Sequence, residues 1–149
     1  LFHSLVQTLI GLNMMITNAD VVGPWNKCPD LIPAYMDNIS ALVLCVNKLL
    51  NMARTTGIRF KINKSTGTLI SGTRYGGFRP KSCPEGAPGS AHKVGKAVDV
   101  YDPDGILDKW ITDDLLRECN LYREHPAKTD GWCHLTVRRP GSGNRTFWP

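Results

Sequence analysis

The sequence lacks the long apolar run that a membrane-spanning helix requires, which is about 18 or more consecutive residues. Its most apolar stretch lies at residues 1–16. That stretch has no basic start and is followed by no small-residue cleavage site, so it does not match a signal peptide. We therefore expect no membrane span, and we expect residues 1–16 to pack on the domain as a helix.

Cysteine is present, but its spacing excludes the common cysteine-based sites. The five cysteines are odd in number and no two have C-x-x-C spacing, which argues against a full disulfide framework and against a cysteine zinc knuckle. Cys45 and Cys119 lie among apolar residues at helical spacing, so we expect them in the core. One disulfide that involves Cys28 or Cys83 stays open.

Several other features are missing. The basic residues give a formal net charge of +5 but are scattered, so the sequence has no basic stripe with interleaved aromatic residues and predicts no nucleic-acid partner. No internal repeat is present. An H-E-x-x-H sequence is also absent, which excludes a zinc site of that type on a helix. The 149 residues, of which 42% are hydrophobic, fit one globular domain.

One long helix is the clearest element that the sequence predicts. Its apolar residues recur at steps of three and four, as expected for one buried stripe. Asp37 or Asn38 can cap its start, and Arg54 with Gly57 beyond it marks its end. The stripe consists of Ile39, Leu42, Val43, Val46, Leu49 and Leu50.

The rest of the chain alternates between short strands, turns and a second helix. We predict two short strands within 57–74, a long loop over 75–90, a strand over 96–102, a helix over 112–122 and a strand over 131–137. This order indicates an α+β domain in which a small, mostly antiparallel sheet packs against helices.

Three side chains on or near the two late strands can bind a metal. In each strand, alternation places one polar side chain, Asp99 or His134, on the face opposite the apolar residues. His92 lies in the loop that leads into the first of these strands. Two imidazoles and one carboxylate form a common catalytic zinc set. From spacing alone an alternative stays open, in which Asp99 pairs with an arginine and the two histidines have structural or surface roles.

Three segments together resemble the zinc D-Ala-D-Ala carboxypeptidase family, which includes phage and bacterial L-alanyl-D-glutamate endopeptidases and shares its fold with the Hedgehog signalling domain. They read "SGTR", "SAHKVGKAVDV" and "GWCHL". The resemblance covers residues 31–149 and leaves 1–30 as an N-terminal helical and loop extension. The residues that match the joined motif are Ser90, His92, Gly95, Ala97, Asp99, Trp132 and His134.

The resemblance implies a role for each matched residue. His92, Asp99 and His134 would hold one Zn²⁺ per chain. Ser90 would orient the site through a hydrogen bond, and Gly95 would let the backbone turn tightly beside the metal.

It also implies residues that face the substrate. Arg74, which follows "SG", would stabilise the developing oxyanion, a role that suits a permanently charged and planar guanidinium. A salt bridge within the sheet is the alternative for Arg74. Trp132 would support the substrate from beside the last histidine.

The general base is where the chain departs from the family. Relatives commonly carry an acid three residues before the last zinc histidine, where this sequence has Gly131. Asp130, four positions before His134, can serve only if the chain bends at Gly131, since four residues of extended strand span about 13 Å. Otherwise Asp130 is an exposed turn residue and the base is His125 or Glu124.

The function implied by the resemblance is that of a zinc-dependent peptidase. Its substrate would be the stem peptide of peptidoglycan at the bacterial cell wall or in the periplasm, and we expect it to act as a monomer. The C-terminal segment is most similar to phage-encoded members, which suggests a lytic or virion-associated role. Whether the enzyme is a carboxypeptidase or an endopeptidase stays open. The alternatives are a non-catalytic zinc-binding interaction domain of the same fold and a basic surface-binding module without metal.

Overall fold

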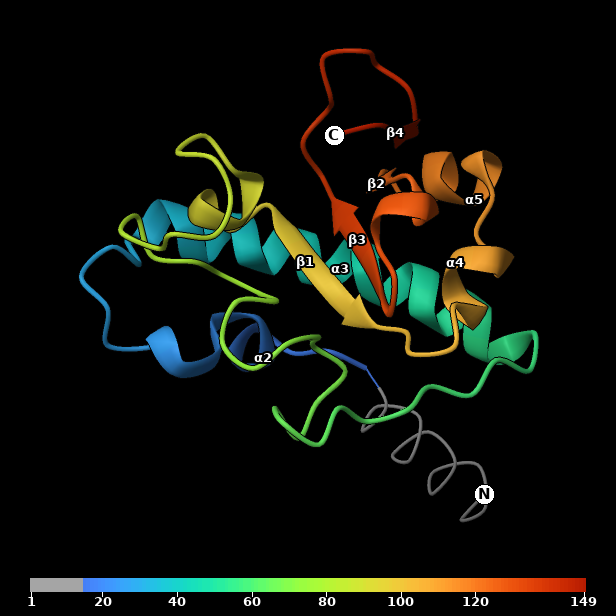
Figure 1. The fold of residues 1–149 in the computed structure, drawn as a ribbon, viewed down its shortest axis with the longest axis horizontal. Coiled ribbons are helices and arrows are strands. Elements are labelled where there is room, and N and C mark those ends of the chain that lie inside the picture. The colour runs from blue at the N-terminus through green and yellow to red at the C-terminus, as the bar shows by residue number, and fades with distance from the viewer. Residues whose placement is uncertain (1–14) are drawn as a thin grey trace.

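The computed structural model describes residues 15–149 (Figure 1). The helix expected over 1–16 therefore falls almost entirely outside the described residues. The elements, in chain order, are α2 (Asn18–Val22), η1 (Gly23–Trp25), α3 (Pro33–Thr55), η2 (Ala91–Val94), β1 (Ala97–Tyr101), α4 (Ile106–Trp110), α5 (Asp113–Glu118), β2 (Tyr122–Glu124), η3 (Pro126–Lys128), β3 (Trp132–Thr136) and β4 (Thr146–Phe147).

The long helix α3 confirms the predicted apolar stripe, because all six of its residues are buried. The predicted start was wrong. The helix begins at Pro33, with Ile32 as its N-cap and no side-chain cap, instead of at Asp37 or Asn38. A proline fits the first helical turn because its fixed φ is already helical and the missing N–H would have no partner there.

The four strands form a mixed sheet in the order β1-β3-β2-β4. β3 pairs antiparallel with both β1 and β2, whereas β2 pairs in parallel with β4. The sequence predicted a mostly antiparallel sheet. This prediction was wrong, because the sheet is mixed. The difference comes from the C-terminal segment, which returns beside β2 after a loop and adds a short parallel edge strand.

The sheet packs on α3 through its apolar face. Figure 1 shows α3 running behind β1 and β3. Val98 and Val100 of β1, and Cys133 and Leu135 of β3, are fully buried and belong to the same apolar cluster as the α3 stripe. The predicted alternation of these two strands is thus confirmed, and it leaves the opposite face of the sheet for polar side chains. The cluster also contains residues that precede α3, namely Ile16, Val21 and Val22.

The segment 57–74 does not form the two strands that were predicted. It contains only isolated bridges, between Asn63 and Thr68 and between Ile70 and Val100. The Asn63 side-chain amide donates hydrogen bonds to the carbonyls of Ile70 and Gly72. In a regular sheet, the backbone N–H groups of a neighbouring strand would supply such bonds. The loop predicted over 75–90 contains no helix or strand, as expected.

The second predicted helix exists but is shorter than expected. Thr112 caps α5 by accepting a hydrogen bond from the Leu115 N–H, and the helix ends at Glu118 because Asn120 adopts a positive φ of 56°. Cys119 is buried and Cys45 is half-buried against the core. All five cysteines, including Cys28 and Cys83, are free thiols. Within 15–149 we find no helix long and apolar enough to cross a membrane.

Candidate metal centre

The pairing of β1 with β3 brings two of the three predicted ligands together. Asp99 and His134 are direct cross-strand partners, and their side chains point to the face of the sheet that does not pack on α3. Asp99 Oδ1 lies 2.8 Å from His134 Nδ1. Alternation predicted the face of each residue, and the register of the ladder makes them neighbours.

The third ligand arrives on the short helix η2, which precedes β1. Ser90 is its N-cap and accepts a hydrogen bond from the His92 N–H, as was expected for an orienting residue. Gly95 ends η2 in the left-handed region, with φ of 76°. A Cβ at this position would lie 2.7 Å from the Tyr35 carbonyl oxygen and 2.8 Å from Ile39 Cγ1, so glycine lets the turn close against α3.

The orientation of the His92 ring is fixed by its backbone partner. His92 is buried, and its Nδ1 lies 2.9 Å from the Gly77 carbonyl oxygen. Because a carbonyl can only accept, Nδ1 donates and Nε2 carries the lone pair of the neutral ring. This Nε2 lies 3.3 Å from Asp99 Oδ1. A lone pair that faces a carboxylate is satisfied when a cation lies between them.

The three donor groups fit a metal ion. One ligand atom each from His92, Asp99 and His134 lies within 4.8 Å of the others. Tetrahedral zinc with bonds of about 2.0–2.1 Å places neighbouring ligand atoms roughly 3.3 Å apart, which agrees with the spacing between His92 and Asp99. The second-nitrogen hydrogen bond of His92 to a carbonyl is the support that metal-binding histidines usually have. Imidazole and carboxylate together suit several divalent metals.

Asp99 is ionised at this site. Its burial would raise the pKa of the carboxyl group, but the neighbouring imidazoles of His92 and His134 outweigh burial and hold the pKa below its ordinary value. Arg79 adds a further cation, with Nη2 at 3.4 Å from Asp99 Oδ2. The backbone is fixed as well, because the Asp99 N–H donates to the Gly76 carbonyl at 2.7 Å.

The cluster opens onto a cleft of about 620 Å³, and Glu124 lines the cleft beside the three candidate ligands. β2 pairs Tyr122 with Thr136 and Arg123 with Leu135. One further step in this register places Glu124 next to His134, on the same face of the sheet. Within 15–149 the Glu124 carboxyl group makes no hydrogen bond or ion pair.

Asp130 does not reach this cleft. The bend proposed at Gly131 exists, with φ of 92°, but Asp130 is exposed and is not among the lining residues. His125 also lies outside the lining: its Nδ1 accepts from the Ala127 N–H, and its ring stacks on Trp148 with centroids 3.9 Å apart. Of the three acids and bases considered from the sequence, Glu124 is the one that the structure brings to the cluster.

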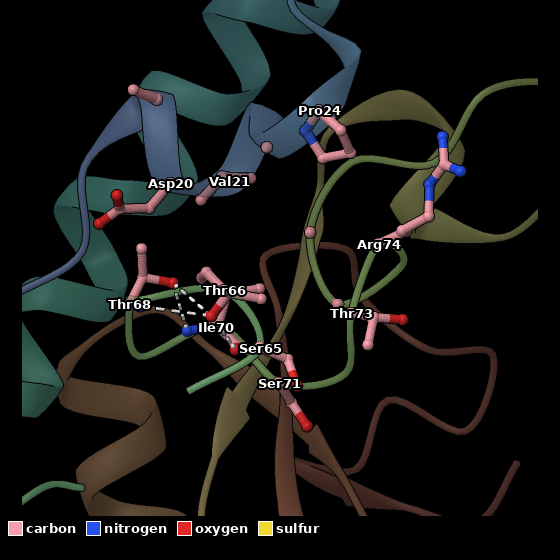
Figure 2. Close-up of a pocket in the computed structure, with 14 residues that line it drawn as sticks. Asp20, Val21, Pro24, Ser65, Thr66, Thr68, Ile70, Ser71, Thr73 and Arg74 are labelled. Carbon is pink, nitrogen blue, oxygen red and sulfur yellow. Dashed lines mark hydrogen bonds between the residues drawn. The ribbon is translucent and has the colours of Figure 1, made fainter. Parts of the chain in front are cut away.

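Arg74 is also placed elsewhere, and Arg79 lies at the cluster instead. Arg74 is exposed, and its guanidinium lies over the Trp25 ring at 4.8 Å from the ring centroid. It lines a separate hollow of about 320 Å³ that contains none of the three candidate ligands. Figure 2 shows Arg74 at the edge of this hollow, across from Asp20 and Thr68. The chain turns repeatedly between residues 72 and 77. The arginine that contacts Asp99 is Arg79, five positions after Arg74.

Aromatic residues form part of the walls of the cleft. Trp132, on the same face of β3 as His134, lines it, as do Phe147 and Trp148 at the C-terminal end. The Phe147 ring meets the His134 ring edge-on, with centroids 6.2 Å apart. The C-terminal segment thus contributes to the candidate site. A comparison of the chain with models of protein families, with curated proteins and with solved structures found no match.

Proposed function

We propose that this chain is a zinc-dependent peptidase that cleaves peptide bonds in the stem peptides of peptidoglycan. The observation that carries the proposal is the convergence of His92, Asp99 and His134 on one cleft that also contains the unpartnered carboxyl group of Glu124. The family resemblance of the three sequence segments supports the same conclusion. It also supports an action at the bacterial cell wall, with phage-encoded lytic proteins as the most similar members.

His92, Asp99 and His134 are the residues that would hold the zinc ion. When bound, zinc supplies a Lewis acid for the scissile carbonyl and lowers the pKa of a coordinated water molecule toward about 7. The chain's part is to present two neutral imidazoles and one carboxylate in fixed positions. The Gly77 carbonyl holds His92 in the tautomer in which Nε2 can bind a metal, and the β1–β3 ladder fixes the other two side chains.

Glu124 is the general base in this proposal, in place of Asp130. Its carboxylate takes a proton from the attacking water molecule and delivers that proton to the leaving nitrogen as the C–N bond breaks. A positioned acid–base group of this kind contributes roughly 10²- to 10⁴-fold to the rate. Arg79 keeps a guanidinium beside Asp99, where it can face negative charge that develops on the substrate carbonyl.

The test is the release of new amines from purified peptidoglycan by the zinc-loaded protein, measured by mass spectrometry with and without chelator. We expect cleavage that the chelator abolishes. Glu124→Gln should retain bound zinc and lose roughly 10²-fold or more in turnover. Asp130→Asn is the matched control, and it should leave both zinc content and turnover unchanged.

Each contrary result has a distinct meaning. If Asp130→Asn loses turnover and Glu124→Gln keeps it, the assignment of the base is wrong. If one zinc is bound per chain but no bond is cut, the chain is a metal-binding interaction domain. If no metal binds at micromolar zinc, a metal-dependent function is excluded. The same comparison for Arg79→Ala and Arg74→Ala should show a loss of turnover only for the first.

A further inference from the structure

The cleft adjoins a second hollow at Asp99. This second hollow of about 240 Å³ shares Arg79, Asp99 and Trp132 with the larger one and extends toward Ser71 and Glu85. Asp99, one of the three candidate ligands, therefore lines both hollows, and a bound peptide has room to extend from the cleft into the second hollow. From this arrangement we infer that the chain is an endopeptidase, which cuts bonds inside a peptide. This inference rests on the peptidase function proposed above.

An enzyme that removes one C-terminal residue needs a particular kind of pocket. Beyond the scissile bond the pocket must hold a single residue, and a cation must meet the terminal carboxylate, because charge-assisted hydrogen bonds supply much of the selectivity for such a group. Neither hollow has this combination, whichever of them holds the carboxyl side of the substrate.

The smaller hollow has the wrong charge for a terminal carboxylate. Its cation, Arg79, lies at the junction of the two hollows, where Nε donates to the Tyr75 carbonyl and Nη2 contacts Asp99. The other charged residues that line it are the acids Asp99 and Glu85, and the rest are neutral. A carboxylate bound there would be repelled by Glu85, whereas an internal residue, or one with an amine, would not.

The larger hollow is too long for one residue. Its volume of about 620 Å³ lies within the range that holds ligands of drug size, which corresponds to several residues. Its second arginine, Arg138, follows the end of β3, and its Nη1 donates to the Gly89 carbonyl at 2.8 Å. This guanidinium is thus already bonded to a backbone carbonyl, and the volume of the hollow leaves room for a segment of more than one residue. Trp148, which is 62% exposed, lines the same hollow and offers an aromatic surface for that segment.

The experiment compares two synthetic stem peptides of the same sequence. One ends in a free carboxylate, and the other is extended by further residues and amidated. Their binding to zinc-loaded Glu124→Gln protein is measured by calorimetry, and their cleavage by wild-type protein is followed by mass spectrometry. We expect the dissociation constants to agree within roughly threefold, and we expect internal cleavage of both peptides.

Two results would overturn the inference. A carboxypeptidase would bind the amidated peptide roughly 10- to 100-fold more weakly, because it would lose the interaction with the terminal charge. Release of single C-terminal residues only would have the same meaning. If neither peptide is cut although zinc is bound, the proposed peptidase function fails, and the binding comparison still decides whether the cleft accepts a continuous chain.

Two variants test the hollows separately. Glu85→Lys places a cation in the smaller hollow, so it should strengthen binding of the peptide with the free carboxylate and leave the amidated peptide unchanged. Trp148→Ala should weaken binding of the extended peptide more than binding of the shorter one. If Glu85→Lys changes both peptides equally, the smaller hollow does not face the peptide terminus and the charge argument fails.

Discussion

Gly95→Ala should destabilise the fold by about 2–5 kcal/mol, because two independent penalties apply at this position. Gly95 has φ of 76°, where a residue with a Cβ costs roughly 1–2 kcal/mol. The added Cβ would also lie 2.7 Å from the Tyr35 carbonyl oxygen and 2.8 Å from Ile39 Cγ1. Both neighbours belong to α3, which cannot shift without disturbing the core, and overpacking of this kind costs about 1–3 kcal/mol.

Gly67→Ala is the matched control for this substitution. Gly67 has a similar φ of 69°, but a Cβ there would meet nothing within 4 Å, so only the conformational penalty of roughly 1–2 kcal/mol applies. Urea unfolding followed by circular dichroism measures both changes, provided that the denaturant slope stays constant. We also expect Gly95→Ala to weaken zinc binding, because η2 carries His92. Equal losses of stability in the two variants would refute the claim that Gly95 is required for the contact with α3.

Three further predictions concern the metal, the core and a buried acid. Zinc at about 100 times its dissociation constant should stabilise the protein by roughly 2.7 kcal/mol, seen as a higher Tm, and His134→Ala should abolish the shift; a shift that survives places the metal elsewhere. Leu49→Ala should lower the free energy of unfolding by about 2–5 kcal/mol, whereas Leu44→Ala, at a position that is 74% exposed, should change it by less than about 0.5 kcal/mol. Burial raises the pKa of Asp108, so the folded protein holds the proton on this carboxyl group more tightly than the unfolded chain does. The resulting contribution to the free energy of unfolding is complete below about pH 4 and is lost as the pH rises through the folded-state pKa. The free energy of unfolding of Asp108→Asn relative to wild type should therefore increase between about pH 4 and pH 7 in urea titrations, and parallel pH profiles would contradict this.

The parts of the fold that could be predicted from the sequence are those with a local signal. The α3 stripe follows from a period that repeats over several turns, and the strands around Asp99 and His134 follow from strict alternation. Because alternation also assigns each side chain to a face, it predicted that both residues point away from the core. Their direct pairing depends on the register between two distant segments, which no local pattern contains.

The position of Glu124 could not be predicted for a related reason. β2 has only three residues and directly follows α5, so the apolar residues around Leu121 were read as the end of a longer helix. The partner that completes this edge of the sheet, β4, has two residues and lies more than twenty positions further along the chain. Short strands such as these are held by their neighbours rather than by their own propensity, and the position of Glu124 beside His134 therefore depends on tertiary structure.

Two consecutive glycines show how much of the site lies outside its ligating side chains. The Gly76 carbonyl accepts from the Asp99 N–H, and the Gly77 carbonyl meets His92 Nδ1, so one short segment supports two candidate ligands. A Cβ on Gly76 would lie 2.1 Å from the Ser71 carbonyl oxygen, and one on Gly77 would lie 2.1 Å from the Val21 carbonyl oxygen. Neither position can carry a side chain without moving the carbonyl that contacts a candidate ligand. The sequence "YGGFR" therefore supports the candidate centre through the backbone of its two glycines and through the side chain of Arg79, which contacts Asp99.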